Sequence, residues 1–306
     1  MRKRVRELEL SVRNGDVSLA GSVFVPSPKA ERTLLMHPGS GPSGRDNDVY
    51  FPPIREYLLN AGIAVCSFDK RGVGGSTGRW QEAGIIEQAG DLLACLARLL
   101  SDPNVPKPVG LFGHSQGGWV VVEAAGRTPE IAFVVTNSGP GVTPLEQERY
   151  SHRTYLAEGG VSDSDMRDAF EPFEELAQAL RRGATYAEVR RRFDSARLPT
   201  VYRERKLVLF PDDDELWSFL LRVFDYDPRP ALERIRVPLL AVFGADDALV
   251  PVEASVSVYR EAVQPRLLTV AVLPGADHRI HSGEPPRLAD GYLEMLADFV
   301  LGAAPP

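Results

Sequence analysis

Cysteine and long apolar runs are both scarce in this sequence. Its 306 residues include two cysteines, Cys66 and Cys95, which are too few for a disulfide framework and show no metal-ligand spacing. Each lies in an apolar segment, which indicates a buried small side chain rather than a reactive thiol. No apolar run approaches the length of about 18 residues typical of a membrane-spanning helix, and no apolar leader core follows the basic residues 1–6. We therefore expect a soluble cytoplasmic protein.

An excess of positive charge is absent as well. The chain carries 35 Lys and Arg against 42 Asp and Glu, a formal net charge of −7, whereas a nucleic-acid surface needs clustered basic residues. Hydrophobic residues make up 43% and charged residues 25% of the chain, as in ordinary globular domains. These values exclude a disordered chain, a collagen-like repeat and a coiled coil. We expect neither nucleic acid nor membrane among the partners, and the composition indicates no oligomeric state.

The apolar residues follow two patterns along the chain. Residues 5–25 alternate between apolar and polar side chains around Asn14-Gly15-Asp16, which predicts a β-hairpin. Short apolar runs, which predict buried strands, then occupy residues 33–36, 64–68, 109–112, 131–135, 239–243 and 267–273. Helical patterns separate them at residues 50–60, 85–100, 116–127, 252–263 and 286–301. This alternation predicts an α/β fold, with a mostly parallel central sheet of about eight strands flanked by helices.

One stretch, residues 142–230, interrupts the alternation of strands and helices. It contains no pattern of a buried strand, but it contains helix-like segments, one of which (185–194) begins with the spacing of a capping box. An acidic run precedes the apolar segment 216–224, and it suits a helix N-terminus better than a metal site. We therefore predict a discontinuous core, residues 1–141 and 231–306, with residues 142–230 inserted as a helical cap.

The strongest chemical signal is the run Gly-His-Ser-Gln-Gly at residues 113–117. It follows a predicted strand and precedes a predicted helix, which is the context that a G-x-S-x-G nucleophile elbow requires. A serine on such a turn, here Ser115, exposes its hydroxyl, and the flanking glycines let the strand and the helix approach. The amide of Gln116 then points at the place where negative charge would develop.

A serine nucleophile needs a base, and the chain has five histidines: His37, His114, His152, His278 and His281. His278 follows the apolar run 267–273 in a loop at a strand end, which is where the base is needed. The side chain of His114, adjacent to the serine, is expected to point away and to pack. His152 lies in the insertion. The H-x-x-H spacing of His278 and His281 lacks a nearby third ligand and does not favour a metal site.

The base in turn needs a carboxylate that orients it. Residues 244–251 follow another predicted strand and contain Asp246 and Asp247. The alternative loop, residues 132–145, contains no Asp or Glu. The chain order is then Ser, Asp, His, as in α/β-hydrolases.

Three further segments carry a family resemblance. Residues 37–46, His-Pro-Gly-Ser-Gly-Pro-Ser-Gly-Arg-Asp, resemble the oxyanion-side loop of an esterase branch in which G-S-G-P precedes an Arg-Asp pair. Residues 67–76 resemble a D-x-R-G-x-G-x-S loop, and residues 244–251 resemble a G-x-x-D-x-x-V-P acid loop. Together with the elbow, they make the chain similar to serine hydrolases of the α/β-hydrolase superfamily. The resemblance implies that Asp247, rather than Asp246, is the acid.

The resemblance also implies an oxyanion hole. One donor is the amide of Gln116. The family often has His-Gly where this chain has His37-Pro38, and proline has no N–H to donate. The second donor is therefore expected to be the amide of Gly39 or Ser40.

These features predict a hydrolase that cleaves carboxylic esters or lactones through an acyl-enzyme on Ser115, with His278 as base and Asp247 as its partner. The alternatives on the same scaffold are a peptidase or amidase and a thioesterase or acyltransferase, and the least favoured is a non-enzymatic ligand-binding protein. The expected partner is a small-molecule ester, lactone or acyl substrate, and no metal or organic cofactor is implied. Most aromatic residues of the insertion are expected to form its own core or its seam with the main domain, and a minority that faced inward would line an apolar pocket.

Overall fold

The protein is built around one eight-stranded sheet. In the computed structural model, residues 4–27, 30–192 and 213–303 are described. The strands are β1 (Val5–Asn14), β2 (Val17–Pro26), β3 (Thr33–His37), β4 (Ala64–Phe68), β5 (Val109–His114), β6 (Val134–Asn137), β7 (Leu239–Gly244) and β8 (Leu268–Leu273). Their spatial order is β1-β2-β4-β3-β5-β6-β7-β8, and from β4 to β8 all neighbours are parallel. The predicted α/β fold is confirmed.

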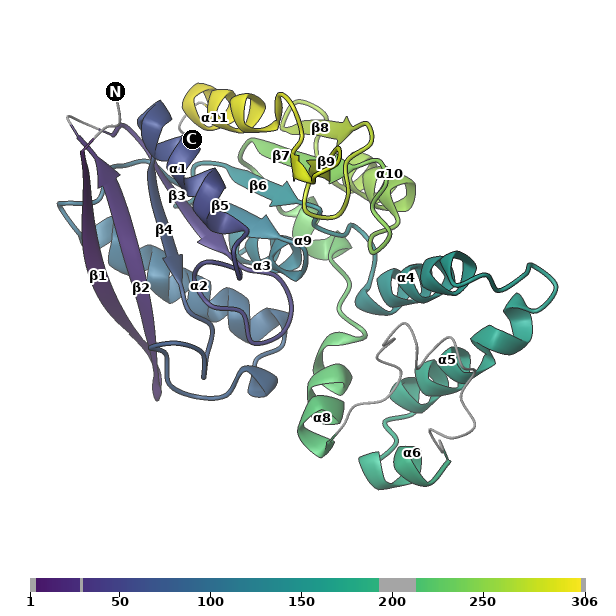
Figure 1. Ribbon diagram of the computed structural model, residues 1–306. Coiled ribbons are helices and arrows are strands. Elements are labelled where there is room, and N and C mark those ends of the chain that lie inside the picture. Colours follow the sequence, from purple (N-terminus) through teal and green to yellow (C-terminus); the bar gives the residue numbers. More distant parts are fainter. Residues whose placement is uncertain (1–3, 28–29, 193–212, 304–306) are drawn as a thin grey trace.

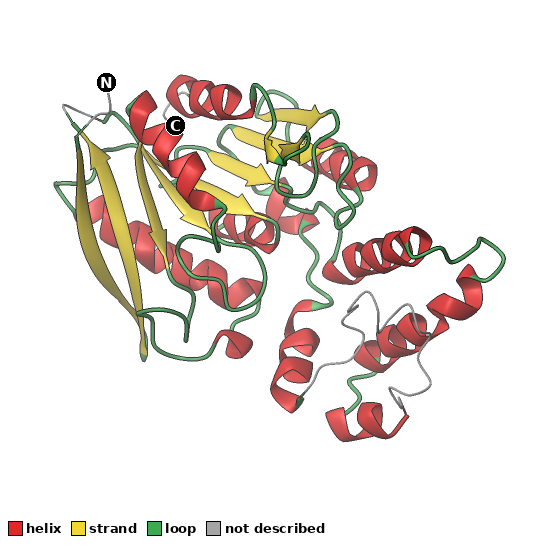
Figure 2. Ribbon diagram, in the orientation of Figure 1, coloured by secondary structure: helices red, strands yellow, loops and turns green. Residues whose placement is uncertain are grey.

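Helices cover both faces of this sheet (Figures 1 and 2). The helices of the described residues are α1 (Phe51–Ala61), α2 (Ile85–Ser101), α3 (Gln116–Ala125), α4 (Pro144–Glu158), α5 (Met166–Arg181), α6 (Tyr186–Arg192), α8 (Asp214–Val223), α9 (Arg229–Glu233), α10 (Val252–Ala262) and α11 (Tyr292–Gly302). A 3₁₀ turn, η1, spans Trp80–Glu82, and the short strands β9 (His281–Ser282) and β10 (Arg287–Leu288) pair with each other. Within the described residues, no helix combines the length and apolarity needed to span a bilayer.

The predicted N-terminal hairpin forms from β1 and β2. Asn14 pairs with Val17 across the turn, and Gly15 there takes a φ of +59°, which glycine adopts without steric cost. The hairpin joins the sheet through antiparallel pairing of β2 with β4.

Two apolar layers hold the helices against the sheet. The first lies between the sheet and α2, α3 and α10, and it includes both cysteines, at 0% and 2% exposure. The second lies between the opposite face and α1 and α11. Strands β3 to β7 are buried along their whole length, as expected for continuous apolar runs in a parallel sheet covered on both faces. The prediction that both cysteines are buried small side chains is confirmed, and burial raises the pKa of their thiols.

The helices α4, α5, α6 and α8 lie between β6 and β7 in the chain and form a group with its own apolar cluster. Figure 1 shows them to one side of the sheet, where β5 and β6 end. Trp217 is 1% exposed within this cluster, and its Nε1 donates to the carbonyl of Ala184 at 2.7 Å. Phe170 and Phe173 stack at 4.9 Å between ring centroids. These aromatic side chains therefore build the core of the inserted helices.

Both predicted helix starts in the insertion are confirmed, with small shifts. Thr185 and Glu188 form a reciprocal capping box, with Thr185 N donating to Glu188 Oε2 at 2.7 Å and Glu188 N donating to Thr185 Oγ1 at 3.3 Å. The acidic run caps α8, because the Asp213 carboxylate accepts from Leu216 N at 2.8 Å. The last two residues of the predicted helix 185–194, and residues 211–212 of the acidic run, lie outside the described residues.

The last predicted helix begins later than expected. The pattern indicated a start at residue 286, but α11 begins at Tyr292. Arg287 and Leu288 pair with β9 instead, and Gly291 takes a φ of +79° directly before the helix. The apolar pattern alone did not reveal this extra strand pairing.

Candidate active site

Ser115 stands on a strained turn between β5 and α3. Its backbone has φ +54° and ψ −123°, a region that non-glycine residues adopt only when the surrounding structure imposes it. The two motif glycines show what imposes it. A Cβ on Gly113 would lie 2.1 Å from the carbonyl oxygen of Gly117, and a Cβ on Gly117 would lie 2.6 Å from that of His37. The helix start is therefore pressed against both β5 and the chain that leaves β3, and Ser115 is left partly exposed.

The structure brings Asp247 and His278 into contact. Nδ1 of His278 lies 2.8 Å from Oδ2 of Asp247, and the other carboxylate oxygen accepts from the amides of Leu249 and Val250 at 2.8 and 2.9 Å. Asp247 is 2% exposed, whereas Asp246 is exposed. Because an ionised carboxylate only accepts, it fixes the proton on Nδ1 and leaves Nε2 of the imidazole for proton transfer.

The loop that carries His278 lies beside the elbow. The ring centroids of His278 and His114 are 5.2 Å apart, and Nε2 of His114 lies 3.4 Å from the carbonyl oxygen of His278. A Cβ on Gly244, at the end of β7, would lie 2.3 Å from the carbonyls of Ala276 and Asp277. Ser115, Asp247 and His278 follow the carboxyl ends of β5, β7 and β8, and these strand ends therefore bring the three residues to one edge of the sheet.

The oxyanion-side loop that follows β3 also reaches the elbow. A Cβ on Gly39 would lie 3.5 Å from the Cβ of Ser115. The amide of Gly39 already donates to Oδ1 of Asn47 at 3.1 Å, while Ser40 is exposed. Gln116 is the first residue of α3, so its amide has no acceptor within the helix. Among the sequence candidates for an oxyanion donor, the amides of Ser40 and Gln116 have no hydrogen-bond acceptor in the described part of the chain, whereas that of Gly39 does.

His114 packs, as predicted, and it also carries a hydrogen-bonded chain that the sequence did not reveal. Its ring lies 4.6 Å from that of Tyr50, and its Nδ1 accepts from Nδ2 of Asn47 at 2.8 Å. Nε2 therefore holds the ring proton and donates to the carbonyl of His278. Burial, and then the charge of His278, hold the pKa of His114 well below its ordinary value. Asn47 thus links the oxyanion-side loop to the loop of the candidate base.

The remaining histidines have other surroundings. His37 is buried at the end of β3 beside Gln88, with 3.2 Å between Nε2 and Oε1, and burial followed by the charge of Lys70 lowers its pKa to about 3. His152 packs in α4 against Phe173 at 4.8 Å. His281 meets the ring of Tyr50 edge-on at 5.9 Å. Over the described ranges, no group of three His, Cys, Asp or Glu side chains is placed to hold a metal ion.

Asp69 ties the oxyanion-side loop to the loop after β4. Its carboxylate accepts from the amide and the Nη2 of Arg45, both at 2.8 Å, and from the amide of Gly75 at 3.1 Å. Burial alone would raise the pKa of Asp69, but the hydrogen bonds from Arg45 and Gly75 outweigh it and lower the pKa. The D-x-R-G-x-G-x-S pattern is explained by this junction. Ser76 completes it by donating to the carbonyl of Asp69 at 2.8 Å.

Asp69→Asn is expected to lower the free energy of unfolding by about 2–3 kcal/mol, because donors around a largely buried carboxylate lose their acceptor. Since the folded pKa of Asp69 is lowered, this stabilisation is present above about pH 4 and is lost as the pH falls further. Urea unfolding at pH 7 and pH 3 measures both effects. Glu9→Gln is the control, because Glu9 binds the same arginine from a side chain that is 65% exposed. An equal loss in both variants contradicts the assignment.

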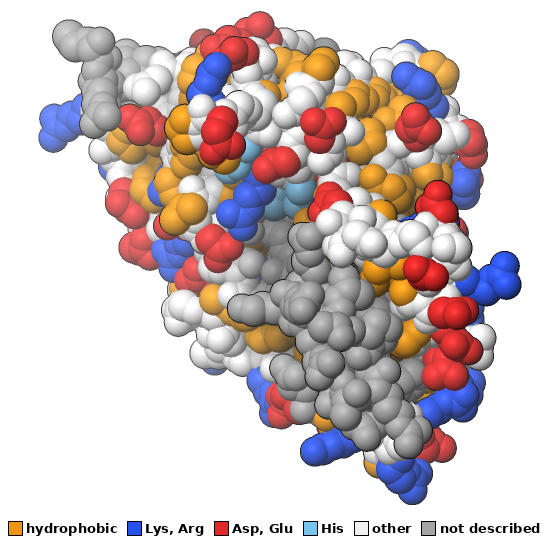
Figure 3. All heavy atoms as spheres, turned by 45° about the vertical axis from the view of Figure 1, so that its right-hand side comes forward, with side chains coloured by type: hydrophobic (Ala, Val, Ile, Leu, Met, Phe, Trp, Pro, Cys, Tyr) orange, Lys and Arg blue, Asp and Glu red, His pale blue; other side chains and the backbone are white. Residues whose placement is uncertain are grey.

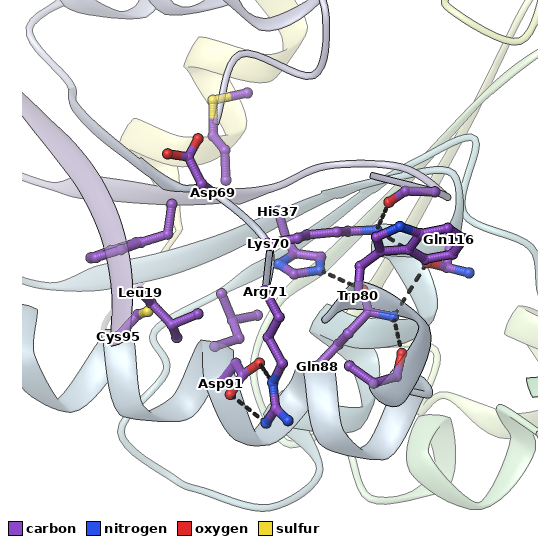
Figure 4. A pocket seen from close by; sticks show the side chains of 15 residues that line it. Leu19, His37, Asp69, Lys70, Arg71, Trp80, Gln88, Asp91, Cys95 and Gln116 are labelled. Atoms are coloured by element: carbon purple, nitrogen blue, oxygen red, sulfur yellow. Dashed lines mark hydrogen bonds and ion pairs between the residues drawn. The ribbon is translucent and has the colours of Figure 1, made fainter. Parts of the chain in front are cut away.

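Lys70, beside Asp69, is a buried cation that sequence analysis missed. It is 7% exposed, and Nζ donates to the carbonyl of Gly39 and, at 3.2 Å, to Oε1 of Gln116. Burial lowers the pKa of its ammonium group to about 7. Figure 4 shows it beside His37, Gln88 and Gln116. These four residues help to line a cavity of about 20 Å³, which has room for about one water molecule.

The inserted helices contact the core next to these residues. The hydroxyl of Tyr150, in α4, donates to the carbonyl of Asp247 at 3.1 Å. Phe219, in α8, meets Trp80 of η1 edge-on at 5.0 Å, and Trp80 lines the cavity beside Lys70. Figure 3 shows histidine side chains at the surface where the core meets the inserted helices. The insertion therefore contacts both sides of the candidate site.

The fold and these contacts define a class: an α/β protein with a serine on a strained strand-to-helix turn and an Asp–His pair beside it. Residues 34–290 match the alpha/beta hydrolase family. Because this match covers most of the chain, the protein belongs to that family. Membership supports a hydrolase.

Similarity to individual proteins agrees with this family. The putative carbamate hydrolase RutD of Rhizobium rhizogenes strain K84 is 29% identical over 230 residues, 74% of this chain and 78% of that protein. An uncharacterized protein of Rickettsia prowazekii strain Madrid E, RP471, is 30% identical over 115 residues. That alignment covers 37% of this chain and 47% of the relative, so the chain spans about half of its length. The esterase Pf2001 of Pyrococcus furiosus shares the fold, with a TM-score of 0.66, 19% identity, and coverage of 98% of this chain and 92% of that chain.

Proposed function

We propose that the protein hydrolyses carboxylic esters or lactones through an acyl-enzyme on Ser115. The observation that carries the proposal is the Asp247–His278 hydrogen bond of 2.8 Å in a loop that lies against the Ser115 elbow. A buried carboxylate that orients an imidazole next to a partly exposed, strained serine contributes nothing to a packed core, which supports a catalytic role for the three residues.

In the proposed first step, Oγ of Ser115 attacks the acyl carbonyl and its proton passes to Nε2 of His278. The carbonyl π electrons move to oxygen, which becomes the oxyanion of a tetrahedral intermediate. The intermediate collapses, the bond to the leaving alkoxy oxygen breaks, and the imidazolium protonates that oxygen. Asp247 stabilises the imidazolium while it exists. Water repeats the sequence on the acyl-enzyme, which releases the acid and restores Ser115.

We assign the oxyanion donors to the amides of Gln116 and Ser40. Of the two sequence candidates for the second donor, Gly39 is engaged with Asn47, which favours Ser40. The Gln116 amide also benefits from the positive end of the α3 dipole. Each such donor contributes about 3 kcal/mol to transition-state stabilisation.

We further propose that residues 142–230 act as a lid over the core formed by residues 1–141 and 231–306. The contacts of Tyr150 with the Asp247 loop and of Phe219 with Trp80 support this role. A lid excludes water from the acyl-enzyme and selects the substrate. Phe170, Phe173 and Trp217 pack within the insertion, so substrate contacts come from its seam with the core, where Tyr150 and Phe219 lie.

A substrate panel tests this function. Purified protein is given nitrophenyl esters of rising chain length, lactones, an aminoacyl anilide, an acyl thioester and an aryl carbamate, each beside Ser115→Ala. We expect Ser115-dependent turnover with kcat/KM highest for esters or lactones. Higher values for the anilide or the thioester would replace the proposal with an amidase or a thioesterase. Binding of an ester without turnover would indicate a ligand-binding protein.

The carbamate is included because a specific observation favours it as the second candidate. RutD, the relative aligned over 74% of this chain, is a putative carbamate hydrolase. A carbamate carbonyl is less electrophilic than an ester carbonyl but can be attacked by the same Ser115 machinery. Carbamate turnover that exceeds ester turnover would select this candidate.

A further inference from the structure

Lys70 carries its charge into the interior without a carboxylate to balance it. Its Nζ donates to the carbonyls of Gly39 and Gly41 and to Oε1 of Gln116, and no described carboxylate pairs with it. Burying an ammonium group without a counter-ion is costly. A lysine at the surface would not pay this desolvation cost, so a functional role for Lys70 would explain why it is buried.

The acceptors of Lys70 surround the proposed oxyanion hole on both sides. The carbonyls of Gly39 and Gly41 flank Ser40, whose amide is the proposed second donor, and the third acceptor is the side chain of Gln116, whose amide is the first. An ammonium group has three N–H donors, which matches the three acceptors. Lys70 thus bridges the two halves of the hole.

The peptide geometry makes this bridge more specific. The carbonyl of Gly39 and the amide of Ser40 belong to one planar trans peptide group, so they point in opposite directions. A cation on the carbonyl oxygen fixes the direction of the Ser40 N–H. It also polarises the peptide, which makes the N–H a stronger donor.

We propose that Lys70 is a positioning residue of the oxyanion hole, which orients and polarises the Gly39–Ser40 peptide and ties it to Gln116. This inference rests on the proposed function. Lys70 itself does not touch the substrate. It acts through Ser40 and Gln116 when negative charge develops on the substrate oxygen, so its effect falls on the transition state rather than on substrate binding.

The surroundings of Lys70 give the proposal a pH signature. The groups that face it are His37 of β3, Asp69 and Arg71 of its own loop, and Asp91 and Cys95 of α2. His37 is neutral because its pKa is lowered to about 3, and Cys95 is a thiol because its pKa is raised.

The two carboxylates at this place are each paired with an arginine, Asp69 with Arg45 and Asp91 with Arg71. The Lys70 ammonium, by contrast, loses its charge near neutral pH. A neutral amine has two N–H donors for three acceptors, so the bridge weakens as the pH rises.

The test measures kcat and KM on nitrophenyl acetate from pH 6 to pH 9 for the wild type, Lys70→Met and Lys107→Met. Lys107 is the matched control, because its Nζ also donates to backbone carbonyls, those of Asp102 and Val105 at 2.7 and 3.3 Å, but before β5, away from Ser115. We expect Lys70→Met to lower kcat by about 10- to 100-fold at pH 6.5 with KM changed less than about threefold. Lys107→Met should match the wild type.

The pH dependence of kcat shows whether Lys70 acts by positioning the oxyanion hole or only by filling space in the core. The wild-type kcat should fall by about 3- to 10-fold above pH 7, as expected for loss of a charge-assisted hydrogen bond, and Lys70→Met should lack this fall. A loss in Lys70→Met that leaves the alkaline limb unchanged, or that appears in KM, overturns the proposal. If Lys70→Met does not fold, the wild-type profile decides alone, because a flat kcat above pH 7 contradicts it.

Ser115→Ala runs beside every assay and separates the two hypotheses. If wild-type turnover equals that of Ser115→Ala, the proposed function fails. If turnover depends on Ser115 but is unaffected by Lys70→Met, only the role of Lys70 fails.

Discussion

Ser115→Ala is expected to lower kcat/KM on esters by about 10⁴-fold or more, a larger loss than that expected for Asp247→Asn. In the proposed mechanism, the alanine removes the oxygen that forms the acyl-enzyme, and a residual rate is left to the proposed oxyanion donors and to substrate binding. The elbow should persist, because its strain is imposed by the close approach of Gly113 and Gly117 to neighbouring backbone. Initial rates with enzyme in excess measure the loss.

Ser138→Ala is the matched control for this substitution. Ser138 follows β6, takes a φ of +49° and is fully buried, so it shares the unusual backbone of Ser115 without its exposure. The kcat/KM of the Ser138→Ala variant should stay within about threefold of the wild-type value, because the surrounding structure, rather than the serine hydroxyl, imposes such a backbone conformation. Equal activity of Ser115→Ala and the wild type would remove Ser115 from the mechanism.

Asp247→Asn is expected to give a smaller loss, about 10³- to 10⁴-fold in kcat. The asparagine keeps the shape of the carboxylate, but it can present an N–H to the imidazole, which favours the wrong tautomer of His278 and no longer stabilises the imidazolium. KM should change little, because the carboxylate lies behind the histidine. Steady-state kinetics at pH 7 measure both constants.

The neighbouring aspartate offers a control that differs by one position. Asp246→Asn removes an exposed carboxylate and should leave kcat within about threefold of the wild type. A larger loss in Asp246→Asn than in Asp247→Asn would show that the acid has been assigned to the wrong residue.

The central sheet could be predicted from the sequence because its inner strands lie in short apolar runs, which have few other ways to be buried. The predicted run 131–135 only overlaps β6, Val134–Asn137, because the last two residues of that strand are polar. The contact between Asp247 and His278 followed from the same logic. Each follows a parallel strand, and the carboxyl ends of parallel strands share one edge of the sheet. The elbow could be predicted because Gly113 and Gly117 lie in the same five-residue motif, and the backbone at these two positions packs too closely for a side chain.

Asn47 and Lys70 could not be predicted, because their roles depend on contacts between segments distant in the chain. A lysine in a polar loop is normally solvated, and only the packing of the oxyanion-side loop against α3 buries Lys70. The choice between Gly39 and Ser40 was open for the same reason, since it rests on the side chain of Asn47. Sequence periodicity also does not show which aromatic side chains of the insertion pack into its own core and which contact the main domain. The structure places Trp217 in the core of the insertion.

Labelling with a fluorophosphonate probe tests the central claim most directly, because the probe forms a stable adduct only with an activated serine beside a base and an oxyanion hole. Intact mass and peptide mapping then locate the adduct. We predict one adduct per chain, on Ser115, with none on Ser115→Ala and slower labelling of Asp247→Asn. An adduct on another residue, or a folded wild-type protein that forms none, would contradict the assignment of Ser115 as the nucleophile.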